Sequence, residues 1–212
     1  MEEFFAANPA LANFAINDYP IFMIFWNLLL LMVPFFLFIL LKWYYKKNKF
    51  KKTGHKFLAA LIFFLWVLFI PNTIYIITDI RHLLNYCPEN YPRICAPNAW
   101  MIMFFFVYAF FGWVFFILLL SQMKSFLKKV FDKKIANLFI IIIIPLVALG
   151  VLLGLVDRFN SWGVFVYPLA ILKIVLIYIT SFYYFRNLLV FIIGLYILYF
   201  LGDFLFKDKF KK

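Results

Sequence analysis

Charged side chains are scarce in this 212-residue chain, in which Asp, Glu, Lys and Arg together make up 14%. Soluble domains carry about 25% charged residues. Hydrophobic residues reach 67%, and the mean hydropathy is +0.99. A domain of this size exposes too much of its surface to hide that apolar area from water. The composition excludes soluble enzymes and disordered chains, and it predicts a polytopic membrane protein.

Acidic residues are rarer still, with nine Asp and Glu against 21 Lys and Arg and a formal charge of +12. In a soluble protein such an excess would suggest a nucleic acid as partner. Here the lysines cluster in short stretches between apolar runs, the pattern that sets the orientation of membrane proteins. We therefore expect membrane lipids as partners and no nucleic acid.

Six apolar stretches are each about 20 residues long, the length that crosses the hydrocarbon core of a bilayer. They predict an all-α transmembrane helix bundle of about six spans, folded as a single domain over residues 1–212. The predicted spans are residues 21–41, 57–80, 99–120, 135–156, 162–182 and 188–206.

The orientation follows from the positions of Lys and Arg. Thirteen of them lie in residues 42–56, residues 124–134 and at Arg186, on one side of the six spans; seven lie on the other side. The richer side is expected to be cytoplasmic, which places both termini on the extracytoplasmic side of the cell membrane. The four lysines after residue 206 then fall on the disfavoured side, a conflict that an incomplete last crossing would remove.

Cysteine occurs only twice, at Cys87 and Cys95, and both lie in the loop CPENYPRIC. The charge distribution places this loop outside the cytoplasm, where disulfides persist. We predict a Cys87–Cys95 disulfide, and the alternative is two free thiols.

The sequence PNTIYIITDIRHL carries four polar residues at helical spacing. Asn72, Tyr75, Asp79 and His82 are separated by three, four and three positions, which places them on one face of a helix. The apolar stretch before Pro71 is too short to cross the membrane alone, so the helix must continue past the proline. One interpretation is a polar helix end in water with Asn72 capping the break. We favour a functional face, because it starts within the bilayer.

A second polar group follows the fourth predicted span. The sequence GVLLG at residues 150–154 has small residues four apart, which allow helices to approach closely. The turn after it carries Arg158, Asn160 and Trp162 on the same outer face as Asp79. We predict that Asp79 lies within side-chain reach of Arg158 or Asn160 and that it pairs with Arg158. The alternative is a solvated loop.

Two polar residues lie inside other predicted spans. Asn27 lies a few residues below the outer surface, and it predicts either a hydrogen bond between helices or a ligand contact. Lys173 lies near the bilayer centre, where a charge is costly. It predicts an anion-binding or pKa-shifted lysine, unless its side chain reaches the membrane surface. The carbonyl of Ile141, freed by Pro145, is a candidate partner.

We expect no metal and no cofactor. No glycine-rich phosphate loop and no GxSxG motif occurs in the chain. His55 and His82 fall on opposite faces of the membrane, so they cannot share a metal ion. Only Asp79, His82 and Asp157 could form a metal site, which we do not favour.

These motifs resemble a bacterial family of integral membrane proteins catalogued as a domain of unknown function. PNTIYIITDIRHL is similar to its PNxxYxxTDxxHL signature, and GVLLGLVDRFNSWG to its GxxxGRFxRxNSWD signature. The chain departs from the pattern at Leu155, where the family has Arg, and at Gly163, where it has Asp. The resemblance covers roughly residues 25–170 and implies membrane localisation, without any activity. The matching motif residues are Pro71, Asn72, Tyr75, Thr78, Asp79, His82, Leu83, Gly150, Gly154, Arg158, Asn160, Ser161 and Trp162.

Two classes of function remain. In the first, the protein binds, senses or transports a small anionic or lipid-like ligand, alone, as an oligomer or in a membrane complex. In the second, it is an enzyme that acts on a lipid-linked substrate at the outer leaflet, with Asp79 or His82 as general base and Arg158 holding a phosphate. A continuous polar cavity reaching Lys173 would favour transport. A shallow pocket open to lipid, with Asp79 and His82 in hydrogen-bond reach, would favour the enzyme.

Overall fold

The computed structural model describes residues 15–16, 19–50, 52–84 and 99–206, and their side chains over residues 21–50, 52–81 and 99–206. A short antiparallel pair, β1 (Ala15–Ile16) and β2 (Tyr19–Pro20), precedes the helices. The helices are α3 (Ile21–Asn48), α4 (Thr53–Phe69), α5 (Pro71–Thr78), the 3-10 helix η1 (Asp79–Leu84), α6 (Trp100–Val130), α7 (Lys133–Leu155), α8 (Gly163–Val166), α9 (Pro168–Thr180) and α10 (Phe182–Phe206).

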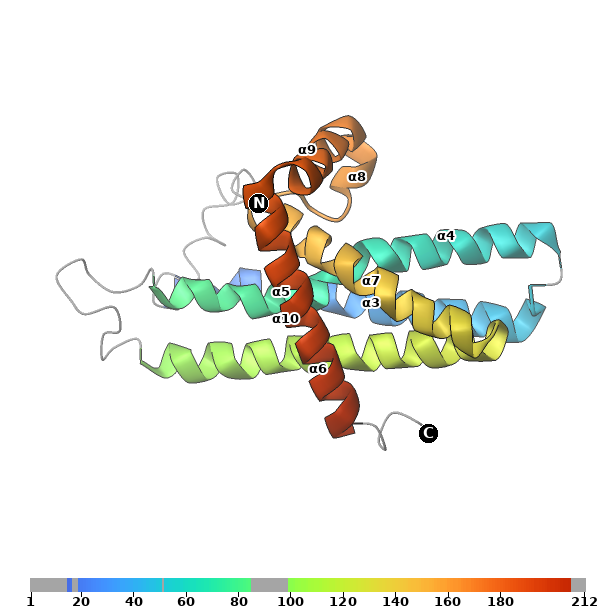
Figure 1. Cartoon of the computed structure of the whole chain (residues 1–212). Coiled ribbons are helices and arrows are strands. Elements are labelled where there is room, and N and C mark those ends of the chain that lie inside the picture. Colours follow the sequence, from blue (N-terminus) through green and yellow to red (C-terminus); the bar gives the residue numbers. More distant parts are fainter. Residues whose placement is uncertain (1–14, 17–18, 51, 85–98, 207–212) are drawn as a thin grey trace.

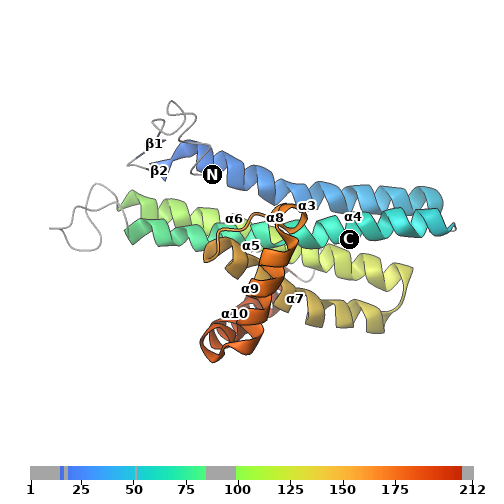
Figure 2. The same cartoon turned by 90° about the horizontal axis from the view of Figure 1, so that it is seen from above.

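Helices α4 and α5 follow one another end to end, and α3 and α6 run roughly parallel to them (Figures 1 and 2). Pro71 is the first residue of α5, so the proline breaks the helix without ending the apolar segment. The segment continues from Thr53 to Arg81 over 29 residues, long enough to cross a membrane. The prediction that the second span continues past Pro71 is therefore confirmed.

Among the described residues, five helices are long and apolar enough to span a membrane. These are Ile21–Asn48, Thr53–Arg81, Trp100–Val130, Lys133–Leu155 and Phe182–Phe206. The predicted span at residues 162–182 is not among them, because this segment folds into α8 and the 13-residue α9. A helix of that length measures about 20 Å, against the roughly 30 Å of a bilayer core. The chain is thus an all-α multi-pass membrane protein with five candidate spans.

Helix α10 crosses α6 and α7 at a steep angle (Figure 1). If all three helices span the membrane, they must therefore tilt from the membrane normal. The indole N–H of Trp113 in α6 donates to the carbonyl of Leu198 at 2.9 Å. Gly202 of α10 allows the backbone to approach Ile117 of α6, since an added Cβ would clash with the Ile117 side chain. These contacts fix α10 against the bundle away from α5.

Candidate functional site

Helix α5 is held between two helices that approach it through glycines. On one side, a Cβ added at Gly112 of α6 would lie 2.5 Å from the carbonyl oxygen of Thr73. On the other, a Cβ at Gly150 of α7 would lie 2.6 Å from Cγ of Pro71, and a Cβ at Gly154 would lie 3.3 Å from the Tyr75 ring. The GVLLG sequence therefore packs directly on the proline and tyrosine of the first motif.

Asn72 joins the two motifs at the helix break. Its side-chain amide donates to the carbonyl of Phe69 at 2.9 Å, a carbonyl that the helix leaves open at the break. The same amide donates to Oγ of Ser161 at 3.0 Å, across 89 residues of sequence. Asn72 thus bonds to the backbone across the break and holds the turn after α7 over α5.

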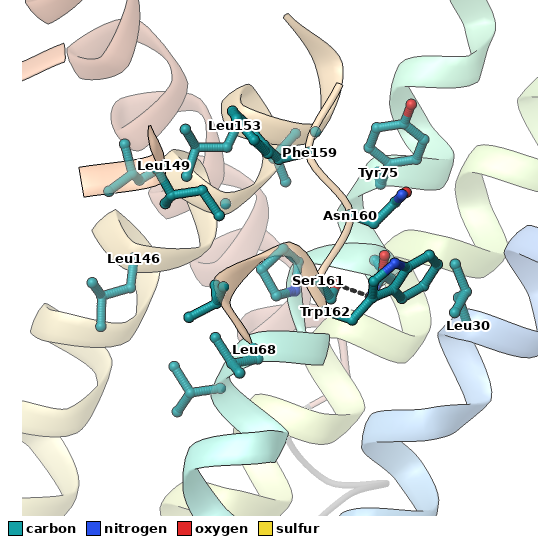
Figure 3. Close-up of a pocket in the computed structure, with 18 of the residues that line it drawn as sticks. Leu30, Leu68, Tyr75, Leu146, Leu149, Leu153, Phe159, Asn160, Ser161 and Trp162 are labelled. Carbon is teal, nitrogen blue, oxygen red and sulfur yellow. Dashed lines mark hydrogen bonds between the residues drawn. The ribbon is translucent and has the colours of Figure 1, made fainter. Parts of the chain in front are cut away.

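The two motifs enclose a pocket of about 210 Å³. Leu146, Leu149 and Leu153 extend into it from α7, opposite Tyr75 and Asn160 (Figure 3). The other lining residues come from α3, α4, α5, α7, the segment after α7, α8 and α9. They are Trp26, Asn27, Leu30, Val67, Leu68, Pro71, Asn72, Gly150, Val151, Gly154, Phe159, Ser161, Trp162, Val164 and Ile171.

The pocket has a polar part and an apolar part. Five lining side chains carry hydrogen-bonding groups besides the tryptophans: Asn27, Asn72, Tyr75, Asn160 and Ser161. The side facing α4 and α7 is aliphatic, and Leu146 at its edge is 46% exposed. None of the lining residues, all of which are described, carries a charge. The pocket therefore suits a molecule with an uncharged polar part and an apolar part.

Aromatic rings and a strained turn form the wall of the pocket beside α3. The rings of Trp26 and Trp162 meet edge to face at 6.4 Å. Arg158, three residues after the end of α7, has a φ of 61°, in the left-handed region that favours glycine. The N–H of Phe159 then returns to the carbonyl of Leu153 at 3.0 Å. This reversal directs Asn160, Ser161 and Trp162 back over the pocket.

The pocket brings together two predicted residues from each motif, together with Asn27 of α3. Asn27, Asn72, Tyr75, Asn160 and Trp162 all line the pocket. Ser161, which was noted only as part of the family signature, adds the hydrogen bond that joins the motifs. As the sequence spacing predicted, Asn72 and Tyr75 lie on one face of α5. One turn later, at Asp79, the segment becomes a 3-10 helix and the spacing no longer applies.

Asp79 lies elsewhere and has a different partner from the one predicted. It is 2% exposed and accepts a 2.8 Å hydrogen bond from Nδ2 of Asn27, which is itself 7% exposed. Asp79 is not among the residues that line the pocket. The predicted pair with Arg158 is not found among the interactions of the described residues, and Arg158 is exposed. A buried carboxylate thus holds a pocket residue instead of facing the pocket.

Tyr108 is a third member of this buried polar cluster, and sequence reasoning missed it. The side chain is 5% exposed, and its hydroxyl lies close enough to interact with Asp79 and Asn27. No regular hydrogen bond joins that hydroxyl to any described residue. The cluster links α3, η1 and α6. Tyr108 is one of 13 tyrosines, and its spacing within α6 gives no signal that separates it from the others.

The structure places Lys173 apart from the other predicted site residues. It is exposed on α9 and does not line the pocket. The carbonyl of Ile141, its suggested partner, instead accepts a 2.9 Å hydrogen bond from the hydroxyl of Tyr196 in α10. The prediction placed Lys173 in the middle of a span, but α9 is too short to be one.

The remaining predicted residues lie outside what the structure describes. These are the side chain of His82 and the whole of Cys87 and Cys95. Among the described residues, no three His, Cys, Asp or Glu side chains are close enough to hold a metal ion. Asp157 accepts a 3.1 Å hydrogen bond from the hydroxyl of Tyr178, which ties α9 to the end of α7.

Comparison with known proteins identifies one family. The model of the family described as Protein of unknown function (DUF1361) matches residues 26–201, which include both motifs and all described residues of the pocket. No curated protein and no solved structure matches the chain.

Proposed function

The chain belongs to the DUF1361 family of unknown function, and we propose that it binds a lipid-like molecule in the pocket between α3, α5, α7 and the segment after α7. The observation that carries the proposal is the division of this pocket into an uncharged polar part and an aliphatic part. Ligand pockets are mostly apolar, with a few polar groups that orient the ligand.

The position of the pocket supports a ligand that comes from the membrane. Its walls belong to three apolar helices that are long enough to span a bilayer. Asn27 lies six residues after the start of α3, roughly 9 Å along the helix axis. The exposed Leu146 at the pocket's edge would face acyl chains, since it lies in the middle of α7. A lipid could therefore reach the pocket sideways.

Binding is favoured over transport and catalysis by the positions of the charged residues. Transport was expected to use a polar cavity that reaches Lys173, and this pocket does not include Lys173. Catalysis was expected to use Asp79 or His82 as general base. Asp79 does not line the pocket, and the side chain of His82 lies outside the described residues. A general base must come within hydrogen-bond reach of the proton that it removes.

The orientation in the membrane follows from the number of spans. With five spans the two termini lie on opposite sides, and we propose that the C-terminus is cytoplasmic. The lysines after residue 206 then join residues 42–56 and 124–134, giving sixteen basic residues on the cytoplasmic side against four outside, with Lys173 in α9. This distribution follows the positive-inside rule better than the six-span arrangement and removes its conflict at the C-terminus.

The experiment compares lipid retention in two tryptophan variants of α4. Leu68 lines the pocket, whereas Leu61 lies two turns away on the same helix and is 43% exposed. Each purified variant is washed extensively in detergent, and the retained lipids are extracted and identified by mass spectrometry. We expect the wild type and Leu61→Trp to retain a lipid in near-stoichiometric amount, and Leu68→Trp to lose it because the indole fills the pocket.

Equal retention by the two variants would show that the lipid lies outside the pocket. Absence of any tightly retained lipid from the wild type would also contradict the proposal. Unfolding temperatures of both variants serve as the control for folding.

A further inference from the structure

The hydrogen bond between Asn27 and Asp79 sets what the pocket offers to a ligand. Nδ2 of Asn27 donates to a carboxylate oxygen of Asp79 at 2.8 Å, so the NH₂ group of Asn27 faces Asp79. The Tyr108 hydroxyl lies near the same amide, on the buried side of the cluster. The carbonyl oxygen of Asn27 is then the polar atom that remains for the pocket, which Asn27 also lines.

Asn72 also offers a carbonyl oxygen to the pocket, for an independent reason. Its NH₂ group is used by the carbonyl of Phe69 and by Oγ of Ser161. Its carbonyl oxygen is therefore left as an acceptor. Ser161 receives a hydrogen bond on its oxygen, which leaves its own O–H group to donate. Two fixed acceptors and the Ser161 hydroxyl donor thus lie around an uncharged space, which Tyr75 and Asn160 also line with groups that can donate or accept.

A group that both donates and accepts hydrogen bonds fits this arrangement, and a hydroxyl group does so. A phosphate or carboxylate does not, because it would bring a negative charge against two carbonyl oxygens with no cation among the lining residues. We propose that the ligand of this pocket is a lipid with an uncharged, hydroxyl-bearing headgroup, and that Asp79 is a positioning residue that holds Asn27 as the acceptor. This inference rests on the proposed lipid-binding function.

The experiment uses lipids that share their oleoyl chains and differ in the headgroup. The probes are dioleoylglycerol, its 3-O-methyl ether, glucosyl-dioleoylglycerol and dioleoylphosphatidic acid. The methyl ether keeps the acceptor oxygen and loses only the donor. Apparent affinities come from the rise in unfolding temperature as each lipid is added to protein in an amine-oxide detergent, which has no hydroxyl groups of its own.

We expect the unmodified protein to bind dioleoylglycerol or its glucoside about three- to tenfold more tightly than the methyl ether, the effect of about one hydrogen bond. Whichever of the two hydroxylated lipids binds more tightly identifies glycerol or sugar as the headgroup. Asp79→Asn and Asn27→Ala should each remove the preference over the methyl ether. The comparison of the hydroxylated lipids with the methyl ether on unmodified protein tests the inference even if both variants fail to fold.

Other outcomes separate this inference from the proposed function. If phosphatidic acid binds most tightly and Leu68→Trp abolishes that binding, the pocket binds lipid but the headgroup assignment is overturned. The same holds if the methyl ether binds as well as dioleoylglycerol. If no lipid stabilises the protein in a way that Leu68→Trp removes and Leu61→Trp keeps, the lipid-binding function itself is overturned.

Discussion

Gly112→Ala tests whether the close contact between α6 and α5 positions the pocket. A Cβ at residue 112 would lie 2.5 Å from the carbonyl oxygen of Thr73 and 3.2 Å from Cβ of Ile76. The first of these atoms belongs to the backbone of α5, so it cannot move aside as a flexible side chain could. Thr73 and Ile76 are fully buried. The added methyl group must therefore push α5 away from α6, toward the glycines of α7.

The expected loss of stability is the difference of two effects. Overpacking a buried contact costs about 1–3 kcal/mol, and a backbone neighbour places this site in the upper part of that range. Replacing a helical glycine by alanine stabilises a helix by roughly 0.5–1 kcal/mol. The net prediction is a loss of about 1–2 kcal/mol for Gly112→Ala. The matched control is Gly194→Ala in α10, where an added Cβ meets nothing within 4 Å; this variant should gain roughly 0.5–1 kcal/mol.

The assay is reversible unfolding by sodium dodecyl sulfate in mixed micelles, followed by tryptophan fluorescence for wild type and both variants. Lipid retention is measured on the same samples, because a shift of α5 would disturb the hydrogen bond between Asn72 and Ser161. If Gly112→Ala were as stable as Gly194→Ala, the contact between α5 and α6 would not be as close as described. The account of how α5 is positioned would then be refuted.

Three further predictions follow from individual contacts. Asp79→Asn should lower the free energy of unfolding by about 1.5–3 kcal/mol, the range for a hydrogen bond to a charged group. Arg158→Gln should change it by no more than about 0.5 kcal/mol, because Arg158 is exposed. Strong coupling between the two substitutions in the double mutant would instead support an Asp79–Arg158 pair. A reporter fused after residue 212 should be active in the cytoplasm, and external labelling of a cysteine placed there would disprove the five-span topology. Cys87 and Cys95 should form a disulfide, seen as a mass increase of about 2 Da on reduction, and two thiols that alkylate without reductant would exclude it.

The lengths of the apolar stretches and the spacing of polar residues determined much of this protein from sequence alone. A segment must be long and apolar enough to match the thickness of the bilayer, and this can be judged for each segment separately. The same local logic placed Asn72 and Tyr75 on one face of α5 and continued the helix past Pro71. It also placed Asn160 and Trp162 at the same level, because both motifs lie at the same ends of their helices.

Contacts between distant segments were decided only by the tertiary structure. Residues 162–182 are apolar enough to span, yet a break at Tyr167 and another at Ser181 shorten the helix to 13 residues. The sequence suggested Arg158 as the partner of Asp79, and the hydrogen bond from Asn27 forms instead because η1 packs close to α3. The left-handed Arg158 turns its segment back over α5, while its own side chain remains exposed. Such choices depend on which surfaces pack together, and hydrophobic periodicity carries no information about which partner a polar side chain meets across helices.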